Sequence, residues 1–269
     1  MKTIPVNFIG YGYWGSILSK KVIEEGFCIE NLVTDKTNIS INHNNLIKKK
    51  EIENIDWTLP TFISTGPLYH HKILQYCKSR SFVEKPYYIS GQSQIILEFK
   101  PYVNYHWYNS LRLRTIKNFI GYNWKQLNVE LYTINKVDRG FSTLEDFLPH
   151  IISIIKFLNP NVIYSHSITK ISDDIYYIEF DYNFNKITFK IGKNDSGYSR
   201  FKTEDFDIKI FNQNSIEVNG SEYTIKKDPL KESIHRYYNY YNTGFCESIF
   251  YSDDFHKLIL EIANKNIDK

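Results

Sequence analysis

The sequence predicts an α/β fold in which a doubly wound parallel sheet precedes an α+β domain with an open, mainly antiparallel sheet. Three observations lead to this prediction. A glycine-rich turn follows an apolar run near the start of the chain, and apolar runs then alternate with helical segments up to about residue 100. After residue 162, short runs alternate apolar and polar residues and are separated by Asn, Gly and Ser, which is typical of half-buried antiparallel strands.

The composition is that of an ordinary globular chain. The 269 residues are enough for two modest domains, with 42% hydrophobic and 23% charged residues. A net charge of +3 is too small to indicate a nucleic-acid partner or a membrane surface. No apolar run approaches the roughly 18 residues of a membrane span, and no signal peptide precedes the first strand. We therefore expect a cytoplasmic protein.

The cysteine and histidine patterns indicate neither disulfides nor metal. Cys28, Cys77 and Cys246 lie far apart, and the sequence contains no Cys-x-x-Cys pair. This pattern suits a reducing compartment. No histidine pair stands at metal-ligand spacing with a third ligand nearby, so we expect no metal site.

The glycine-rich turn reads Gly10-x-Gly12-x-x-Gly15 and stands between a predicted strand and a predicted helix. Gly10 permits the sharp turn, Gly12 permits close approach of a pyrophosphate, and Gly15 permits tight packing of the helix on the strand. The helix N-terminus then directs free N–H groups at the phosphates. A bare glycine turn is the alternative, but the strand–turn–helix context favours a Rossmann dinucleotide-binding fingerprint. Tyr13 and Trp14 are expected beside the pyrophosphate or the nicotinamide.

The second predicted strand, 29–35, ends in an acid. Asp35 lies 20 residues beyond Gly15, where a carboxylate reaches the adenosine ribose hydroxyls. An acid there repels a 2′-phosphate, so the sequence favours NAD(H) over NADP(H), a preference that the neighbouring Lys36 tempers. A simple turn residue is the alternative for Asp35. Residues 37–56 are polar and are predicted to form a loop and a short helix.

Two further polar clusters follow the next predicted strands. The strand 59–64 leads into Thr65-Gly66-Pro67 and then His70, and a later strand leads into Glu84-Lys85-Pro86. His70 is placed near the cofactor by this pattern, with a solvent-facing loop histidine as the alternative. Taken in order with the glycine turn and Asp35, these clusters resemble the Gfo/Idh/MocA family of sugar-type dehydrogenases.

The resemblance implies a dinucleotide-binding domain at 1–102 and a substrate and oligomerisation domain at 103–269, with the C-terminal helix returning toward the first domain. It implies that the Glu-Lys-Pro tripeptide lies beside the nicotinamide and that Lys85 contacts the reacting hydroxyl or carbonyl. The residues expected at the cofactor are Gly10, Gly12, Tyr13, Trp14, Gly15, Asp35, Lys36, Thr65, Gly66, Pro67, His70, Glu84, Lys85 and Pro86.

The segment 140–160 resembles the family's helix that carries Asp-x-x-x-His. Asp146 and His150 are four residues apart and therefore share one helix face. A capping Asp and a buried core His are the alternative. His150 is the candidate for proton transfer because imidazole titrates near neutral pH, and Asp146 would orient it or bind a neighbouring hydroxyl. The residues expected at the substrate are Lys85, Trp107, Tyr108, Asp146 and His150.

Some positions depart from the family pattern. The run 103–109 resembles the strand that enters the second domain, but Trp107 and Ser153 stand where members often have arginine and a second acid. The Tyr237–Tyr241 cluster is suited to stacking on a carbohydrate or, as we favour, to packing between helices.

These features predict an NAD(P)-dependent oxidoreductase that moves a hydride to or from a sugar, sugar nucleotide or related polyol or keto compound. The alternatives are a reductase of an imine or a conjugated, bilin-like double bond, and a nucleotide-binding homologue without catalysis. The expected partners are a small-molecule substrate and further copies of the chain, in a dimer or tetramer formed through the C-terminal sheet.

Overall fold

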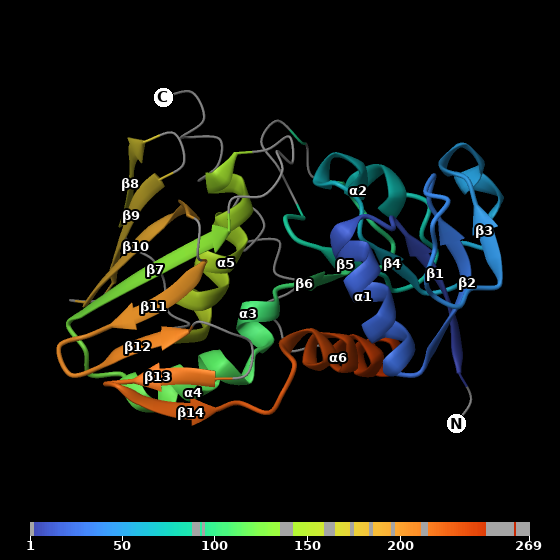
Figure 1. Ribbon diagram of the computed structural model, residues 1–269. Coiled ribbons are helices and arrows are strands. Elements are labelled where there is room, and N and C mark those ends of the chain that lie inside the picture. The colour runs from blue at the N-terminus through green and yellow to red at the C-terminus, as the bar shows by residue number, and fades with distance from the viewer. Residues whose placement is uncertain are drawn as a thin grey trace. The chain divides into compact units, whose positions relative to one another are not determined.

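The computed structural model describes residues 3–87, 92, 95–134, 142–158, 165–172, 175–182, 185–194, 197–210, 215–245 and 261 (Figure 1). The chain divides into two compact units. The first consists of Met1–His106 and Leu230–Leu260, and the second of Trp107–Pro229 and Glu261–Lys269. The predicted C-terminal helix falls almost entirely on residues 246–260 and 262–269, which lie outside the described residues.

The first unit contains a six-stranded parallel sheet with the order β3-β2-β1-β4-β5-β6. Its strands are β1 (Ile4–Ile9), β2 (Phe27–Val33), β3 (Asn45–Ile47), β4 (Thr61–Ile63), β5 (Phe82–Glu84) and β6 (Tyr102–Asn104). From β1 the chain moves to β2 on one side of the sheet, whereas from β4 it moves to β5 in the opposite direction across the sheet. Right-handed crossovers therefore place α1 (Tyr13–Glu24) and α2 (Pro67–Leu74) on opposite faces. This order confirms the predicted doubly wound sheet.

Two segments of this unit differ from the sequence prediction. The segment 37–56 contains a short strand, β3, followed by the 3-10 helix η1 (Lys49–Asn54). The run 103–109 is not one strand: β6 stops at Asn104, and a short helix, α3 (His106–Asn109), follows. In both places the run of apolar residues is too short to show where a strand begins or ends.

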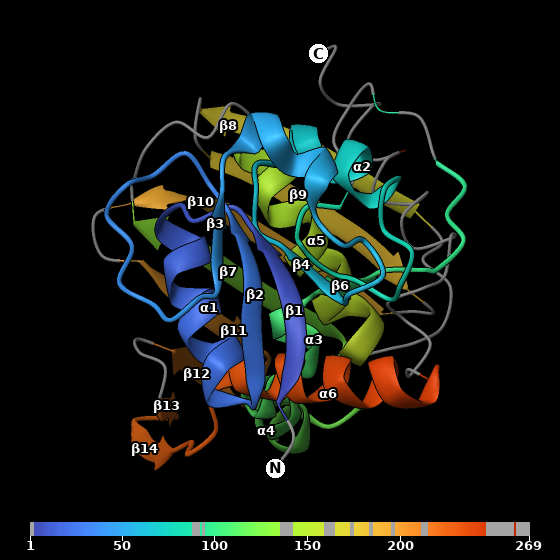
Figure 2. The ribbon, with the colours of Figure 1, turned by 90° about the vertical axis from the view of Figure 1, so that its right-hand side faces the viewer.

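An aromatic row crosses the parallel sheet. Phe8, Phe62, Phe82 and Tyr102 are register partners on β1, β4, β5 and β6, and all four are fully buried. Tyr237, from α6 (Pro229–Thr243), packs over the row with ring centroids 5.0 Å from Phe62 and 5.6 Å from Phe82. Figure 2 shows the axis of α6 running across the strand direction. Tyr237 is thus a core residue, but it packs between a helix and the sheet rather than between helices as the sequence analysis favoured, and Tyr238 of the same cluster is 39% exposed.

Asparagines occupy the alternate positions of the same sheet. Asn31 Nδ2 donates to Asn7 Oδ1 at 2.8 Å, and Asn45 Nδ2 donates to Asn31 Oδ1 at 3.2 Å. Asn7 Nδ2 also donates to the Asp56 carbonyl at 2.8 Å. Side chains alternate between the faces of a strand, so this amide ladder lies on the face opposite Phe8. It joins β1, β2 and β3 with hydrogen bonds, of which the one between Asn7 and Asn31 is buried.

The second unit contains an eight-stranded mixed sheet with the order β14-β13-β12-β11-β7-β10-β9-β8. Its strands are β7 (Gln126–Ile134), β8 (Ser165–Ser172), β9 (Ile175–Tyr182), β10 (Asn185–Asn194), β11 (Tyr198–Lys202), β12 (Asp207–Ile210), β13 (Ser215–Val218) and β14 (Ser221–Thr224). β7 and β10 run parallel, whereas the other neighbouring pairs are antiparallel. This arrangement confirms the predicted, mainly antiparallel second sheet.

Two helices accompany this sheet. The long apolar helix α5 (Thr143–Leu158) packs against β10, and α4 (Leu111–Ile120) packs beside α5. Lys117 Nζ of α4 donates to the Phe157 carbonyl at 2.8 Å and so satisfies a carbonyl near the end of α5. Within the described part of the chain, no helix is both long and apolar enough to cross a membrane.

We expect Tyr237→Ala to lower the free energy of unfolding of the first unit by about 3 kcal/mol, because it empties the space over the aromatic row. Tyr238→Ala, which removes a ring that is 39% exposed, is the matched control and should cost less than about 1 kcal/mol. Urea denaturation followed by tryptophan fluorescence measures both. Equal losses of unfolding free energy in the two variants would mean that Tyr237 does not hold α6 against the sheet.

Candidate functional site

The carboxyl ends of four parallel strands carry the polar clusters that the sequence singled out. Parallel strands end at one edge of their sheet, and ligands bind at this edge where the strand order reverses, here between β1 and β4. The clusters follow β1, β2, β4 and β5 and comprise Gly10–Gly15, Asp35–Lys36, Thr65–Pro67 and Glu84–Pro86. The fold therefore brings together at one edge residues that are up to 76 positions apart.

The glycine turn has the geometry that the fingerprint requires. Gly10 has a φ of +96°, and a Cβ there would lie 2.6 Å from the Ser64 carbonyl oxygen. A Cβ on Gly15 would overlap the carbonyl oxygen of Gly10, so this glycine permits α1 to approach β1. A Cβ on Gly12 would meet no atom within 4 Å. Gly12 thus faces open space at the N-terminus of α1, where a phosphate group fits.

Within the described part of the chain, two buried hydroxyls beside this turn have no hydrogen-bond partner. They are Ser64 Oγ and Thr65 Oγ1, at the carboxyl end of β4. A buried polar atom without a partner costs about 1–3 kcal/mol, and such atoms often belong to a ligand site. Oxygen atoms of a dinucleotide could pair with both, so the residues present fit this class of cofactor. Ser64 was not among the predicted residues, although a polar residue directly after an apolar strand is a usable signal.

Asp35 has a partner that the sequence prediction did not include. Its carboxylate accepts the backbone N–H of Lys49 at 3.1 Å, and the Lys49 ammonium lies 3.6 Å away. Both side chains are more than half exposed. The adjacent Lys36 directs its backbone N–H to Thr34 Oγ1 at 3.2 Å. Asp35 therefore remains accessible to a ribose while its charge is partly balanced by Lys49.

His70 is buried rather than exposed on a loop. Its Nδ1 lies 3.1 Å from the Pro86 carbonyl oxygen and its Nε2 lies 3.0 Å from the Thr65 carbonyl oxygen. Burial lowers the pKa of this imidazole to about 4, so it is neutral at physiological pH. A neutral imidazole has one N–H and therefore donates to one of these two carbonyls, while its other nitrogen only faces the second. His70 thus lies between the loop after β4 and the loop after β5 and donates a hydrogen bond to one of them.

Glu84 is an acidic residue that is buried at this edge of the sheet, where only 5% of the residue is exposed. Burial raises the pKa of its carboxyl to about 7, and hydrogen bonds from the Trp14 and Asn104 side chains oppose this rise. The charge and the backbone N–H of Lys85 act in the same direction as these hydrogen bonds. Trp14 therefore contacts the tripeptide cluster as well as the glycine turn, and its ring lies 6.2 Å from that of His106.

The second unit carries Asp146 and His150, one helical turn apart on α5. Ser142 and Glu145 cap this helix reciprocally, with Ser142 N donating to Glu145 Oε2 at 2.8 Å and Glu145 N donating to Ser142 Oγ at 3.2 Å. The cap is thus formed without the Asp146 side chain. His150 is 8% exposed, and Ser153 Oγ donates to its carbonyl at 2.7 Å.

The other predicted substrate residues lie near α3. Trp107 is half-buried, and its ring centroid lies 6.0 Å from that of Phe201. The side chain of Tyr108 lies outside the described atoms. Lys85 belongs to the first unit, and Asp146 and His150 belong to the second. Their convergence on one substrate stays a prediction.

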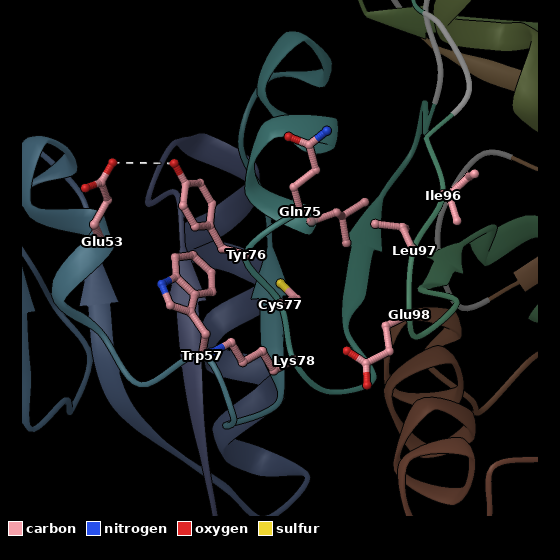
Figure 3. Close-up of a pocket in the computed structure, with 10 residues that line it drawn as sticks. Glu53, Trp57, Gln75, Tyr76, Cys77, Lys78, Ile96, Leu97 and Glu98 are labelled. Carbon is pink, nitrogen blue, oxygen red and sulfur yellow. Dashed lines mark hydrogen bonds between the residues drawn. The ribbon is translucent and has the colours of Figure 1, made fainter.

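A pocket of about 430 Å³ lies elsewhere in the first unit (Figure 3). The Trp57 and Tyr76 rings stack in it with centroids 5.2 Å apart, and the Tyr76 hydroxyl donates to Glu53 at 3.4 Å. It is lined by Glu53, Trp57, Leu74, Gln75, Tyr76, Cys77, Lys78, Ile96, Leu97 and Glu98. None of these is a predicted site residue, so the pocket is separate from the strand edge described above.

Glu84 predicts a pH dependence of stability. Its native pKa of about 7 is above the ordinary carboxyl value of 4.5, so between these values the native protein binds more protons than the unfolded chain. The free energy of unfolding should therefore fall as pH rises from 5 to 8, by about 3 kcal/mol from this group. Glu84→Gln should remove this fall, whereas Glu222→Gln, an exposed control on β14, should keep it. Denaturation at several pH values measures the difference, and an unchanged slope in Glu84→Gln would refute the assignment.

The comparisons with known proteins give structural matches only. No protein-family model matches the chain, and no curated protein matches its sequence. A protein classed as an oxidoreductase from Magnetospirillum magnetotacticum MS-1 is similar in fold, with a TM-score of 0.75, 10% identity, and coverage of 97% of this chain and 98% of that chain.

Two other solved structures are dehydrogenases. A levoglucosan dehydrogenase in complex with NADH and levoglucosan has a TM-score of 0.71 at 12% identity, covering 97% of each chain. The UDP-N-acetylglucosamine 3-dehydrogenase of Acidithiobacillus ferrooxidans has a TM-score of 0.67 at 12% identity, covering 98% of this chain and 96% of that chain. The chain thus has, over nearly its whole length, the two-part fold of these oxidoreductases.

Proposed function

We propose that this chain is an NAD(P)-dependent oxidoreductase of the Gfo/Idh/MocA type that acts on a sugar, a sugar nucleotide or a related polyol or keto compound. One observation carries the proposal. The strand edge holds a glycine turn that opens at Gly12, beside the unpaired hydroxyls of Ser64 and Thr65, and the same edge presents Lys85. The fold shared with a levoglucosan dehydrogenase that binds NADH supports this class of reaction.

The nicotinamide cofactor supplies the redox chemistry, and the protein supplies position and proton transfer. In this proposal Lys85 donates a hydrogen bond to the substrate oxygen that becomes, or ceases to be, a carbonyl. His150 takes or returns the accompanying proton, and Asp146 orients the imidazole or binds a neighbouring hydroxyl. Trp107 forms an apolar wall where other members present a charge.

The test of this proposal is turnover of a sugar panel with NAD, using levoglucosan, myo-inositol and UDP-N-acetylglucosamine as probes. Lys85→Ala should reduce turnover about 100-fold, as loss of an acid–base group does, while NADH binding stays within about twofold. Lys20→Ala, which removes an exposed lysine of α1, is the control and should leave both unchanged. Unchanged turnover in Lys85→Ala would remove Lys85 from the mechanism.

Other outcomes of the same assay identify the alternatives. Reduction of an imine or a conjugated double bond, without activity on sugars, would indicate the reductase alternative. NADH binding with no hydride transfer to any probe would indicate a nucleotide-binding homologue. The departures at Trp107 and Ser153 keep this last alternative relevant, because Ser153 directs its hydroxyl to the His150 backbone rather than supplying an acid.

We also propose that NAD(H) binds more tightly than NADP(H), because the exposed Asp35 carboxylate would repel a 2′-phosphate. The preference should be moderate, since Lys49 balances part of this charge. Asp35→Ala should shift the ratio of the two dissociation constants toward NADP(H) on the order of tenfold. Glu53→Ala, an exposed acid on η1, is the control. Fluorescence titration with NADH and NADPH measures the ratio, and no shift in Asp35→Ala would contradict the assignment.

Assembly into a dimer or tetramer through the eight-stranded sheet stays a prediction. In the second unit α5 packs against β10 of this sheet. Light scattering coupled to size-exclusion chromatography determines the oligomeric state.

A further inference from the structure

A chain of buried hydrogen bonds runs from helix α6 to Glu84 within the first unit. Ser233 Oγ donates to Asn104 Oδ1 at 2.7 Å, and Asn104 Nδ2 donates to Glu84 Oε1 at 2.7 Å. The Tyr102 hydroxyl lies 3.1 Å from Ser233 Oγ, and because the Ser233 hydrogen points to Asn104, Tyr102 is the donor in that pair. Tyr102, Asn104 and Ser233 are all fully buried. All donors of this hydrogen-bond chain therefore point toward Glu84.

The other contacts of Glu84 are donors as well. The Trp14 side chain and the Lys85 backbone N–H lie beside its carboxyl group and, as donors, lower its pKa. An indole N–H, an amide NH₂ and a backbone N–H can only donate, whereas a protonated carboxyl group needs an acceptor for its own hydrogen. The hydrogen-bond donors around Glu84 thus favour the carboxylate form and fix its position in the interior, and with a pKa of about 7 this form predominates at pH 8.

The sheet order indicates which half of a dinucleotide meets this charge. Asp35 marks the adenosine ribose at the end of β2, and the glycine turn marks the pyrophosphate at the end of β1. β4 and β5 lie on the other side of β1, so the remaining half extends over them toward Glu84. Trp14, in the first turn of α1, contacts Glu84 and so links the glycine turn to Glu84.

We propose that Glu84 is a fixed counter-charge for the oxidised nicotinamide and that Asn104 and Ser233 are positioning residues that hold it in place. The oxidised ring is cationic and the reduced ring is neutral, so a buried anion beside it stabilises the oxidised form selectively. This inference rests on the proposed function, because it requires the cofactor at this edge. It gives α6, which lies about 130 residues after β6 in the chain, a part in the site.

The test compares the dissociation constants of NAD⁺ and NADH at pH 8 by calorimetry and fluorescence, without any substrate. Glu84→Gln should weaken NAD⁺ binding about tenfold and leave NADH within about twofold. Ser233→Ala should change the ratio about threefold in the same direction. Tyr240→Phe is the matched control, because the Tyr240 hydroxyl donates from the same helix to the Lys100 carbonyl at 2.7 Å. It should lower the thermal midpoint without changing the ratio.

An unchanged ratio in Glu84→Gln would overturn the counter-charge. A Ser233→Ala ratio equal to that of Tyr240→Phe would overturn the positioning role. Failure of the wild-type protein to bind either nucleotide would instead overturn the proposed function, so the two failures are distinct.

The wild-type protein offers a second measurement if Glu84→Gln does not fold. Between pH 6 and 8 the ratio should shift toward NAD⁺ as Glu84 ionises, since its pKa is about 7. Among the described residues, the titratable groups around Glu84 are Lys85, Tyr102 at the far end of the hydrogen-bond chain, and His106 against Trp14. His106→Gln removes the imidazole against Trp14 and should leave the shift in place. A ratio that does not vary with pH would overturn the inference.

Discussion

The structure of the first unit depends on the packing of Tyr237 against the aromatic row of the parallel sheet. The ring of this one residue contacts Phe27 on β2, Phe62 on β4 and Phe82 on β5, and its hydroxyl donates to the Arg80 carbonyl at 2.7 Å. Such a contact fixes both the position and the rotation of α6. Ser233, four residues earlier, then lies on the same face and reaches Asn104 at the end of β6.

Packing and electrostatics are therefore coupled in this unit. The aromatic row buries apolar side chains. The ends of the same strands hold polar groups, and burying a polar group costs free energy unless it finds a hydrogen-bond partner. The fold satisfies some of them internally, as with Glu84 and Asn104. It leaves the hydroxyls of Ser64 and Thr65 without partners beside the glycine turn. This contrast separates the polar groups that stabilise the fold from those that stay without a partner at the strand edge of the described structure.

Local patterns were sufficient to predict the two sheets and the strand-end clusters. The glycine turn could be located because its glycines are closely spaced in the sequence: Gly10 turns the chain with a positive φ, and Gly15 permits the helix to approach the strand. The helix that carries Asp146 and His150 could likewise be predicted from its own short stretch of sequence. The roles of Asn104, Ser233 and Lys49 were not predictable in this way, because each depends on a partner that is distant in the sequence. His70 shows the same limit, since a pattern places it near the site but cannot tell that its ring nitrogens face backbone carbonyls.

By itself, the sequence determined the alternation of strands and helices, the glycine turn, the acid after the second strand and the Glu-Lys-Pro cluster, because each is specified by neighbouring residues and by side-chain period. Only the tertiary structure decided which of these polar groups are buried and which donor each one meets. Burial and hydrogen-bond partners are set by contacts between elements such as β6 and α6, and these contacts do not appear in any short stretch of the chain.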